Sequence, residues 1–297
     1  MLVTMKVILE NASKNNYAVA APNVITELDA RAYIEVAEEL KAPLILDFGY
    51  GMHPDIYFIA KVCIMLAEES NVPIALNLDH GGEKEQILEA IRAGFTSVMV
   101  DRSSLPFEEN VRDVKEIVDI AHSLGISVEA ELGHVGQADN YVIDRNAALT
   151  SVDEAVEFVK RTGVDCLAVA IGTAHGSYPK GFKPEIDFKR LTEIKKALSD
   201  LPLVLHGSSG TDIEDLRKVC RMGINKVNIC NDLCQGAASA VKNADLSGNG
   251  AYSVYNVLRD GSKEILYKMI KVYGSEGKSF EVEAKGIGFG MKSMEEQ

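Results

Sequence analysis

The sequence repeats one local pattern. An amphipathic helical segment ends at a glycine, and a short run of apolar and β-branched residues follows it. The clearest copies lie at 94–100, 125–131, 163–169 and 223–229. A glycine just past a helix can adopt the left-handed conformation that terminates the helix, so each copy predicts a helix followed by a strand. Further strands are expected at 18–21, 43–48, 74–78 and 203–205.

Eight expected strands, each followed by a helix, constrain the fold class. Several strand runs are almost continuously apolar, as in parallel strands that are buried on both faces. Alternating strands and helices imply right-handed crossovers. Eight such units favour an α/β fold of the closed (β/α)₈ (TIM) barrel type over an open doubly wound sheet. No linker divides the chain, so we expect a single barrel domain over 1–280 and a C-terminal tail over 281–297.

Some of the expected helices and loops carry their own signals. Ser151 and Glu154 have the spacing of a capping box, and Thr211 and Glu214 repeat it, so Ser151 and Thr211 are the predicted N-caps. The longest irregular segment, 133–150, is rich in Gly, Asn and Asp and is typical of an active-site loop.

The charge balance limits the classes of partner. The 297 residues include 44 acidic and 31 basic side chains, a net charge of −13, which argues against nucleic-acid binding but allows one small anionic ligand.

No apolar run reaches the ~18 residues that a membrane span needs, and the N-terminus lacks a secretory signal pattern. Five cysteines, mostly within apolar segments, predict buried thiols rather than disulfides or a Cys-x-x-Cys zinc site. These features together predict a cytoplasmic protein.

Three of the six histidines end strand runs: His80, His175 and His206. In a barrel the carboxyl ends of all strands open onto one face, which carries catalysis. A single histidine there would be interpreted as a hydrogen-bonded loop residue, but three imidazoles with an open fourth position are typical of a catalytic zinc site. Asp101 and Glu131 also end strands, and they are either alternative metal ligands or hydrogen-bonding loop acids.

Other polar residues adjoin the same strand ends. Asp79, beside His80, is placed either for proton transfer next to a metal or for orienting an imidazole. Two segments predict a phosphate cradle because small residues let backbone N–H groups approach an anion at a helix N-terminus. They are Gly207-Ser208-Ser209-Gly210 after the seventh expected strand and Asn228-Ile229-Cys230-Asn231 at the end of the eighth.

Most of these candidates fall within short motifs: Asn77-Leu78-Asp79-His80, 128–133 (VEAELG), 169–176 (VAIGTAHG), 205–210 (LHGSSG) and Lys226-Val227-Asn228. With the ending at 273–278 (YGSEGK), they resemble the class II, metal-dependent ketose-bisphosphate aldolases, which act on fructose or tagatose bisphosphate. The resemblance runs from about Tyr17 to Lys278.

The resemblance implies a (β/α)₈ barrel that performs aldol cleavage and condensation of a ketose (bis)phosphate such as fructose or tagatose 1,6-bisphosphate. The products would be dihydroxyacetone phosphate and an aldehyde, formed through a zinc-stabilised enediolate in carbohydrate metabolism such as glycolysis. It also implies one Zn²⁺ per subunit, a monovalent cation as a further candidate cofactor, and a homodimer or homotetramer.

Residue by residue, the resemblance implies that His80, His175 and His206 bind the zinc ion. Asp79 would be the acid/base that works on the C4 oxygen. The substrate and its phosphate would be held by residues of the cradle segments and of the pocket beside them: Asn23, Gly176, Lys180, Gly207, Ser208, Ser209, Asn228 and Asn231.

The sequence departs from the family pattern at several positions. Asp139 is the best match to the loop glutamate that moves a proton of dihydroxyacetone phosphate, and His134 is an alternative base. The family's Gln-x-Ser is Asp47-Phe48-Gly49 here, its Asp-Pro-Arg is Ser253-Val254-Tyr255, and its Phe before Asn23 is Pro22. The changes at 47–49 and 253–255 concern the aldehyde half of the substrate. We therefore expect a metal aldolase whose aldehyde partner differs from glyceraldehyde 3-phosphate and includes unphosphorylated aldehydes.

Two other functions compete with this interpretation. Lys226 is the only lysine inside a strand run, so it is the candidate for a Schiff-base lyase, although a barrel-interior role is favoured. A non-catalytic barrel that binds sugar phosphates is the second alternative. The sequence leaves open the identity of the aldehyde, the configuration at C4 and the oligomeric state.

Overall fold

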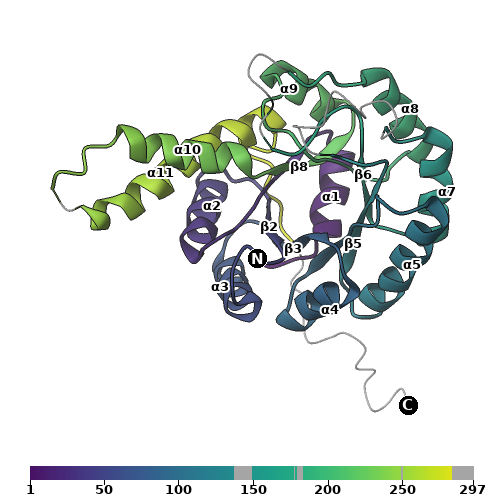
Figure 1. Ribbon diagram of the computed structural model, residues 1–297, viewed down its shortest axis with the longest axis horizontal. Coiled ribbons are helices and arrows are strands. Elements are labelled where there is room, and N and C mark those ends of the chain that lie inside the picture. Colours follow the sequence, from purple (N-terminus) through teal and green to yellow (C-terminus); the bar gives the residue numbers. More distant parts are fainter. Residues whose placement is uncertain (137–148, 177, 179–182, 249, 283–297) are drawn as a thin grey trace, which may run out of the picture.

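The computed structural model describes residues 1–136, 149–176, 178, 183–248 and 250–282, and it confirms the barrel (Figure 1). Its eight strands are β1 (Val19–Pro22), β2 (Leu44–Gly49), β3 (Ile74–Gly81), β4 (Ser97–Val100), β5 (Ser127–Leu132), β6 (Cys166–Val169), β7 (Leu203–Leu205) and β8 (Ile224–Ile229). Each of the eight expected strand runs overlaps one of them. No helix in the described part of the chain is long and apolar enough to span a bilayer.

The strands form one parallel sheet in the order β1-β8-β7-β6-β5-β4-β3-β2. The ring closes between β1 and β2 through a parallel bridge from Asn23 to Asp47, where the Val24 N–H also donates to the Asp47 carbonyl at 2.8 Å. This closure brings the carboxyl ends of all eight strands to one face of the barrel.

Nine helices follow the strands in the described part of the chain. They are α2 (Glu27–Glu39), α3 (Ile56–Glu69), α4 (Lys84–Ala93), α5 (Phe107–Ser123), α7 (Val152–Thr162), α8 (Phe188–Leu198), α9 (Ile213–Arg221), α10 (Asn231–Asn243) and α11 (Ala251–Tyr273). The predicted helix-ending glycines all have positive φ, between 72° and 114°, at positions 94, 125, 163 and 223. The repeat in the sequence therefore marks real helix ends.

The opposite end of the barrel is closed by a helix that precedes the first strand. α1 (Met5–Lys14) lies across the centre of the ring in Figure 1. Its buried side chains, among them Met5, Ile8 and Leu9, pack against inward residues of the strands such as Val19 and Ile45. Substrate access is thus restricted to the face at the carboxyl ends.

One of the two predicted N-caps is correct. The Ser151 hydroxyl accepts from the Glu154 N–H at the start of α7. Thr211 is not the cap of α9, because the Thr211 N–H still belongs to a turn with the Ser208 carbonyl. The cap is Asp212, whose carboxylate accepts from the Glu214 N–H. A carboxylate one residue nearer the helix satisfies the same free N–H group.

Helices α10 and α11 pack against each other and extend together away from the barrel (Figure 1). They approach closely at two glycines, since a Cβ on Gly236 would lie 2.9 Å from the Gly261 carbonyl oxygen. Tyr255, at a departure from the family pattern, lies on α11 with 59% of its surface exposed. Most of the expected active-site loop and all but the first two positions of the expected tail lie outside the described residues.

Candidate metal and sugar-phosphate site

Asp79 and His80 are neighbours in β3, yet both side chains line the same pocket. Adjacent residues of a regular strand point to opposite faces. Here the register between β3 and β4 shifts between Leu78 and Gly81, and His80 has a φ of +50°. Gly81 permits this bulge because a Cβ there would lie 2.4 Å from the Met99 carbonyl oxygen. The bulge at the strand end thus brings a carboxylate and an imidazole into one site.

His206 and His175 follow β7 and β6, two strands that pair with each other and not with β3. His206 directly follows β7 and is fully buried. The expectation that a strand runs to His175 is wrong: β6 ends at Val169, and His175 lies in the following loop, where its N–H donates to the Gly136 carbonyl at 2.8 Å. A Cβ on Gly207 would lie 2.4 Å from the Ala174 carbonyl, so the two segments touch along their backbones.

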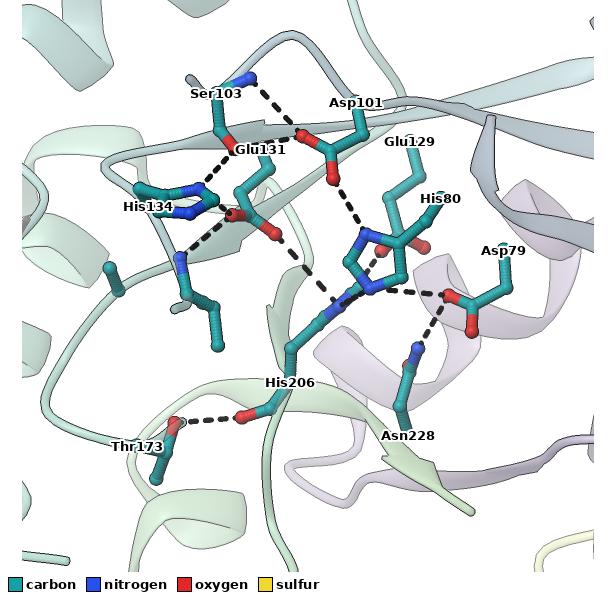
Figure 2. A network of polar contacts seen from close by, with 12 residues as sticks. Asp79, His80, Asp101, Ser103, Glu129, Glu131, His134, Thr173, His206 and Asn228 are labelled. Carbon is teal, nitrogen blue, oxygen red and sulfur yellow. Dashed lines mark hydrogen bonds and ion pairs between the residues drawn. The ribbon is translucent and has the colours of Figure 1, made fainter. Parts of the chain in front are cut away.

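The three predicted imidazoles meet. The ring centroids of His80 lie 4.8 Å from His175 and 4.7 Å from His206. His80 Nε2 faces His206 Nδ1 at 3.0 Å. The other nitrogen of each of these two rings contacts a carboxylate. His80 Nδ1 lies 2.7 Å from Asp101 Oδ2, and His206 Nε2 lies 2.8 Å from Glu129 Oε1 (Figure 2).

This arrangement fits a metal ion. In both His80 and His206, a carboxylate accepts a hydrogen bond from the ring nitrogen on the far side. The near nitrogens of the two rings therefore offer their lone pairs to one point. His175 Nε2 is buried and has no hydrogen-bond partner among the residues that the structure describes. The nitrogens of the three rings lie within 4.8 Å of one another. Three imidazole ligands, with carboxylates hydrogen-bonded to the far nitrogens of two of the rings, are typical of a catalytic zinc site.

The two acids that the sequence offers as alternative ligands occupy different positions. Asp101 contacts His80 Nδ1 and therefore orients a ring, although the cluster of His80, Asp101 and Glu131 also has metal-ligand spacing. Glu131 Oε1 accepts from the Val135 N–H. Its Oε2 is buried 3.9 Å from His206 Nδ1 and has no hydrogen-bond partner in the described part of the chain. Burial and the nearby Asp101 raise the pKa of Glu131 to about 8. Glu131 is thus the better placed of the two to approach a metal.

Asp79 is held from both sides by amides. Asn23 Nδ2 donates to Asp79 Oδ2 and Asn228 Nδ2 donates to Asp79 Oδ1, each at 2.9 Å. Burial alone would raise the pKa of Asp79, but His80, His206 and the other cationic and amide neighbours hold it below its ordinary value. The carboxylate is therefore ionised and oriented at the wall of the pocket, where it can accept a proton.

A buried ion cluster lies beneath the site. Lys226 Nζ is 3.0 Å from Asp47 Oδ2 and 2.9 Å from Glu129 Oε2, and all three side chains are fully buried. The change at 47–49 was expected to concern the aldehyde half of the substrate, but Asp47 is not among the described residues of the pocket wall. Asp47 lies within β2, and its side chain points into the barrel interior, where it pairs with Lys226 and accepts from Asn77 at 2.8 Å. Glu129 was not among the predicted site residues, although it lies in the motif at 128–133.

The site opens into a pocket of about 520 Å³. Its walls include every described residue expected to hold the substrate or its phosphate: Asn23, Gly176, Gly207, Ser208, Ser209, Asn228 and Asn231. Ser208 Oγ donates to the Asn228 carbonyl at 2.8 Å, which joins the two predicted cradle segments. Asp139 and Lys180 lie outside the described residues.

Two wall residues, Met52 and Cys234, belong to no segment that the sequence places at the site, whereas Val135 and Gly136 belong to the expected active-site loop and Cys230 to an expected cradle segment. All five cysteines are free, but only Cys63, Cys166 and Cys220 are buried, so the prediction of buried thiols is wrong for the other two. Met52 could have been expected at the site from its position shortly after β2, at the catalytic end of the barrel. Among the described wall residues there is no lysine or arginine, and Tyr255 is not part of the wall.

Comparisons with known proteins agree with this geometry. The sequence model of the class-II fructose-bisphosphate aldolases matches residues 3–278. The crystal structure of the YdjI aldolase from Escherichia coli K12 is 37% identical, with a TM-score of 0.85 over 94% of this chain and 100% of that one. A fructose-bisphosphate aldolase from Campylobacter jejuni shares the fold, with a TM-score of 0.80 and 21% identity over 94% of this chain and 97% of its own. The chain is an aldolase and belongs to the class-II fructose-bisphosphate aldolase family.

Proposed function

We propose that this aldolase cleaves and forms the C3–C4 bond of a ketose phosphate with one zinc ion held by His80, His175 and His206. The proposal is carried by the convergence of three ring nitrogens. Two of these rings contact carboxylates through their other nitrogen, and the third nitrogen is buried without a partner among the described residues. A bound zinc ion would polarise the ketone oxygen and stabilise the negative charge that develops as the bond breaks.

In this proposal Asp79 is the acid/base. Its ionised carboxylate accepts the proton of the C4 hydroxyl while the C3–C4 bond breaks and the C4 carbonyl forms, and it returns that proton in the condensation direction. Asn23 and Asn228 donate to its two oxygens and so keep the carboxylate turned toward the pocket.

A second proton carrier must serve C3 of dihydroxyacetone phosphate. Asp139 and His134 remain the two candidates. The His134 side chain lines the pocket, and its Nδ1 lies 3.0 Å from Ser103 Oγ, which in turn donates to Asp101 (Figure 2). His134 is thus linked to the carboxylate that orients His80, which supports its candidacy.

The phosphate of the ketose would bind where the loops after β7 and β8 meet. Gly176, Gly207, Ser208, Ser209, Asn228 and Asn231 line this part of the pocket, and α10 begins at Asn231. A helix N-terminus and small residues favour an anion without a basic surface. Lys180 is proposed as an additional ligand, and a monovalent cation as an additional cofactor, on family analogy alone.

For the aldehyde half, the charge of the wall favours a substrate with a single phosphate. Asp79 and Asp101 are charged wall residues, and the described wall contains no lysine or arginine to neutralise a second phosphate. We therefore favour an unphosphorylated aldehyde over glyceraldehyde 3-phosphate. On family analogy we also propose a homodimer or homotetramer that works in the cytoplasm.

A cleavage assay tests both parts of the proposal. Release of dihydroxyacetone phosphate is measured from a panel of ketose 1-phosphates and from fructose and tagatose 1,6-bisphosphate. We expect at least about tenfold higher kcat/KM for a monophosphate, loss of turnover with EDTA and recovery with Zn²⁺. Equal or better turnover of fructose 1,6-bisphosphate would reject the single-phosphate substrate, and full activity after metal removal would reject the zinc mechanism.

Borohydride trapping in the presence of substrate checks the Schiff-base alternative at Lys226, which is fully buried against Asp47 and Glu129.

A further inference from the structure

Lys226 occupies an unusual position for a lysine. It lies in the middle of β8, its side chain is fully buried in the barrel interior, and it does not belong to the described pocket wall. A buried ammonium group requires partners for its donors, because an unpaired charge in the interior is very costly.

The Lys226 ammonium has three such partners from three strands. Its Nζ lies 2.7 Å from Asn228 Oδ1 on β8, 2.9 Å from Glu129 Oε2 on β5 and 3.0 Å from Asp47 Oδ2 on β2. The contact with Asn228 is a hydrogen bond in which the ammonium group donates, and the contacts with Glu129 and Asp47 are ion pairs that compensate its charge.

The contact with Asn228 determines which way its amide faces. Because Lys226 can only donate, the amide oxygen must face Nζ, and the amide nitrogen is then directed at Asp79 Oδ1, 2.9 Å away. Without this cation the amide could turn and present its oxygen to the Asp79 carboxylate, which would repel it.

The contact with Glu129 acts on the metal side of the site. Lys226 binds Glu129 Oε2, while Glu129 Oε1 accepts from His206 Nε2 at 2.8 Å. A carboxylate at Nε2 places the proton of the neutral ring there, so Nδ1 keeps its lone pair on the side that faces His80.

We propose that Lys226 is a positioning residue that sets both halves of the site: through Asn228 it orients the acid/base Asp79, and through Glu129 it selects the ligating tautomer of His206. The catalytic consequence rests on the proposed function, whereas the effect on metal affinity does not depend on which substrate is cleaved.

The competing explanation is charge balance alone, in which Lys226 only neutralises buried acids. Asp47 separates the two explanations, because its side chain contacts Lys226 and Asn77 but neither Asn228 nor Glu129. Removing the charges of Lys226 and Asp47 together keeps the net charge of the interior unchanged. It still removes the two contacts that orient Asn228 and Glu129.

The test compares the Asp47→Asn protein with the double variants Asp47→Asn/Lys226→Met and Asp47→Asn/Lys226→Gln. For each protein we measure the melting temperature, the zinc Kd by competition with a chromophoric chelator, and kcat and KM for cleavage. We expect folded double variants whose zinc Kd rises about 10–100-fold, the usual effect of losing an outer-shell partner. We also expect kcat to fall more than KM rises, and less in the Gln variant, which can still donate to Asn228 Oδ1.

The proposal is overturned if a folded double variant has a zinc Kd and a kcat within threefold of those of the Asp47→Asn protein. Charge balance would then be the explanation. The matched control is Lys195→Met, which removes a half-buried lysine that bonds Ser13 and Leu201 on the outside of the barrel. It should lower the melting temperature without changing zinc Kd. If the wild-type enzyme cleaves no ketose phosphate, the proposed function fails, and the zinc Kd series still decides the role of Lys226.

Discussion

His80 Nε2 and His206 Nδ1 face each other at 3.0 Å, and the far nitrogen of each ring is already occupied by a carboxylate, Asp101 or Glu129. Two lone pairs at this distance repel unless something positive lies between them. One shared proton can take that place in the metal-free protein. In the proposed metal site a zinc ion, with His175 as a third ligand, would take it instead.

The Asp101 carboxylate is therefore expected to contribute to metal affinity without binding the metal. Asp101→Asn removes the charge that accepts from His80 Nδ1, and the ring loses both its orientation and part of its basicity. We expect the zinc Kd to rise about 10–100-fold, measured by chelator competition. Asp119→Asn is the control, because Asp119 is an exposed carboxylate of α5 whose partner is Lys115. An unchanged zinc Kd in Asp101→Asn would contradict the assignment.

Asp79 and the second proton carrier should be separable by assay. Asp79→Asn keeps the size of the side chain but removes the base that serves C4, so we expect kcat for cleavage to fall about 10²–10⁴-fold. Exchange of the C3 proton of dihydroxyacetone phosphate with solvent, followed by NMR, should persist because it does not require the C4 base. Equal loss of cleavage and exchange would mean that Asp79 serves the metal or the fold instead.

The barrel and the histidine cluster could be predicted because both follow from periodic or positional signals. The glycines at 94, 125, 163 and 223 end helices, and the strand runs between them are apolar enough to be recognised singly. Once the barrel is assumed, His80 and His206 must share a face because both lie at strand ends.

The remaining features depend on tertiary contacts and turns that cannot be recognised in a single sequence. Asp47 lies within β2, and which side of a strand a polar residue occupies is decided by register and by a partner, here Lys226, that is distant in sequence. Cys234 looks like an ordinary apolar residue in sequence, and only the turn from β8 into α10 exposes it to the pocket.

Gly207 is expected to be irreplaceable for steric reasons. Its φ is +64°, and a Cβ would lie 2.4 Å from the Ala174 carbonyl, beside His175, the proposed metal ligand. Gly207→Ala should lower the free energy of unfolding by about 1–3 kcal/mol, the cost of a strained backbone, and weaken zinc binding because the 174–176 segment must move. Thermal denaturation and chelator competition measure the two effects. Gly248→Ala is the control, since a Cβ there meets no atom within 4 Å, and equal stability of the two variants would refute the steric argument.

Cys234 should be the most reactive thiol of the chain. It is exposed at the pocket wall, and its hydrogen bond with Cys230 lowers its pKa to about 7, whereas burial raises the pKa of Cys63 to about 12. Only the thiolate is alkylated, so the rate of iodoacetamide labelling should rise as the pH increases through about 7 and level off above it. Peptide mass spectrometry should find the label on Cys234 before it appears on the buried cysteines.

Loss of cleavage activity should follow the labelling of Cys234. Dihydroxyacetone phosphate should slow both the labelling and the inactivation, because the thiol borders the proposed phosphate cradle. Cys234→Ser should abolish the inactivation, and continued inactivation of that variant at the same rate would place the sensitive group elsewhere.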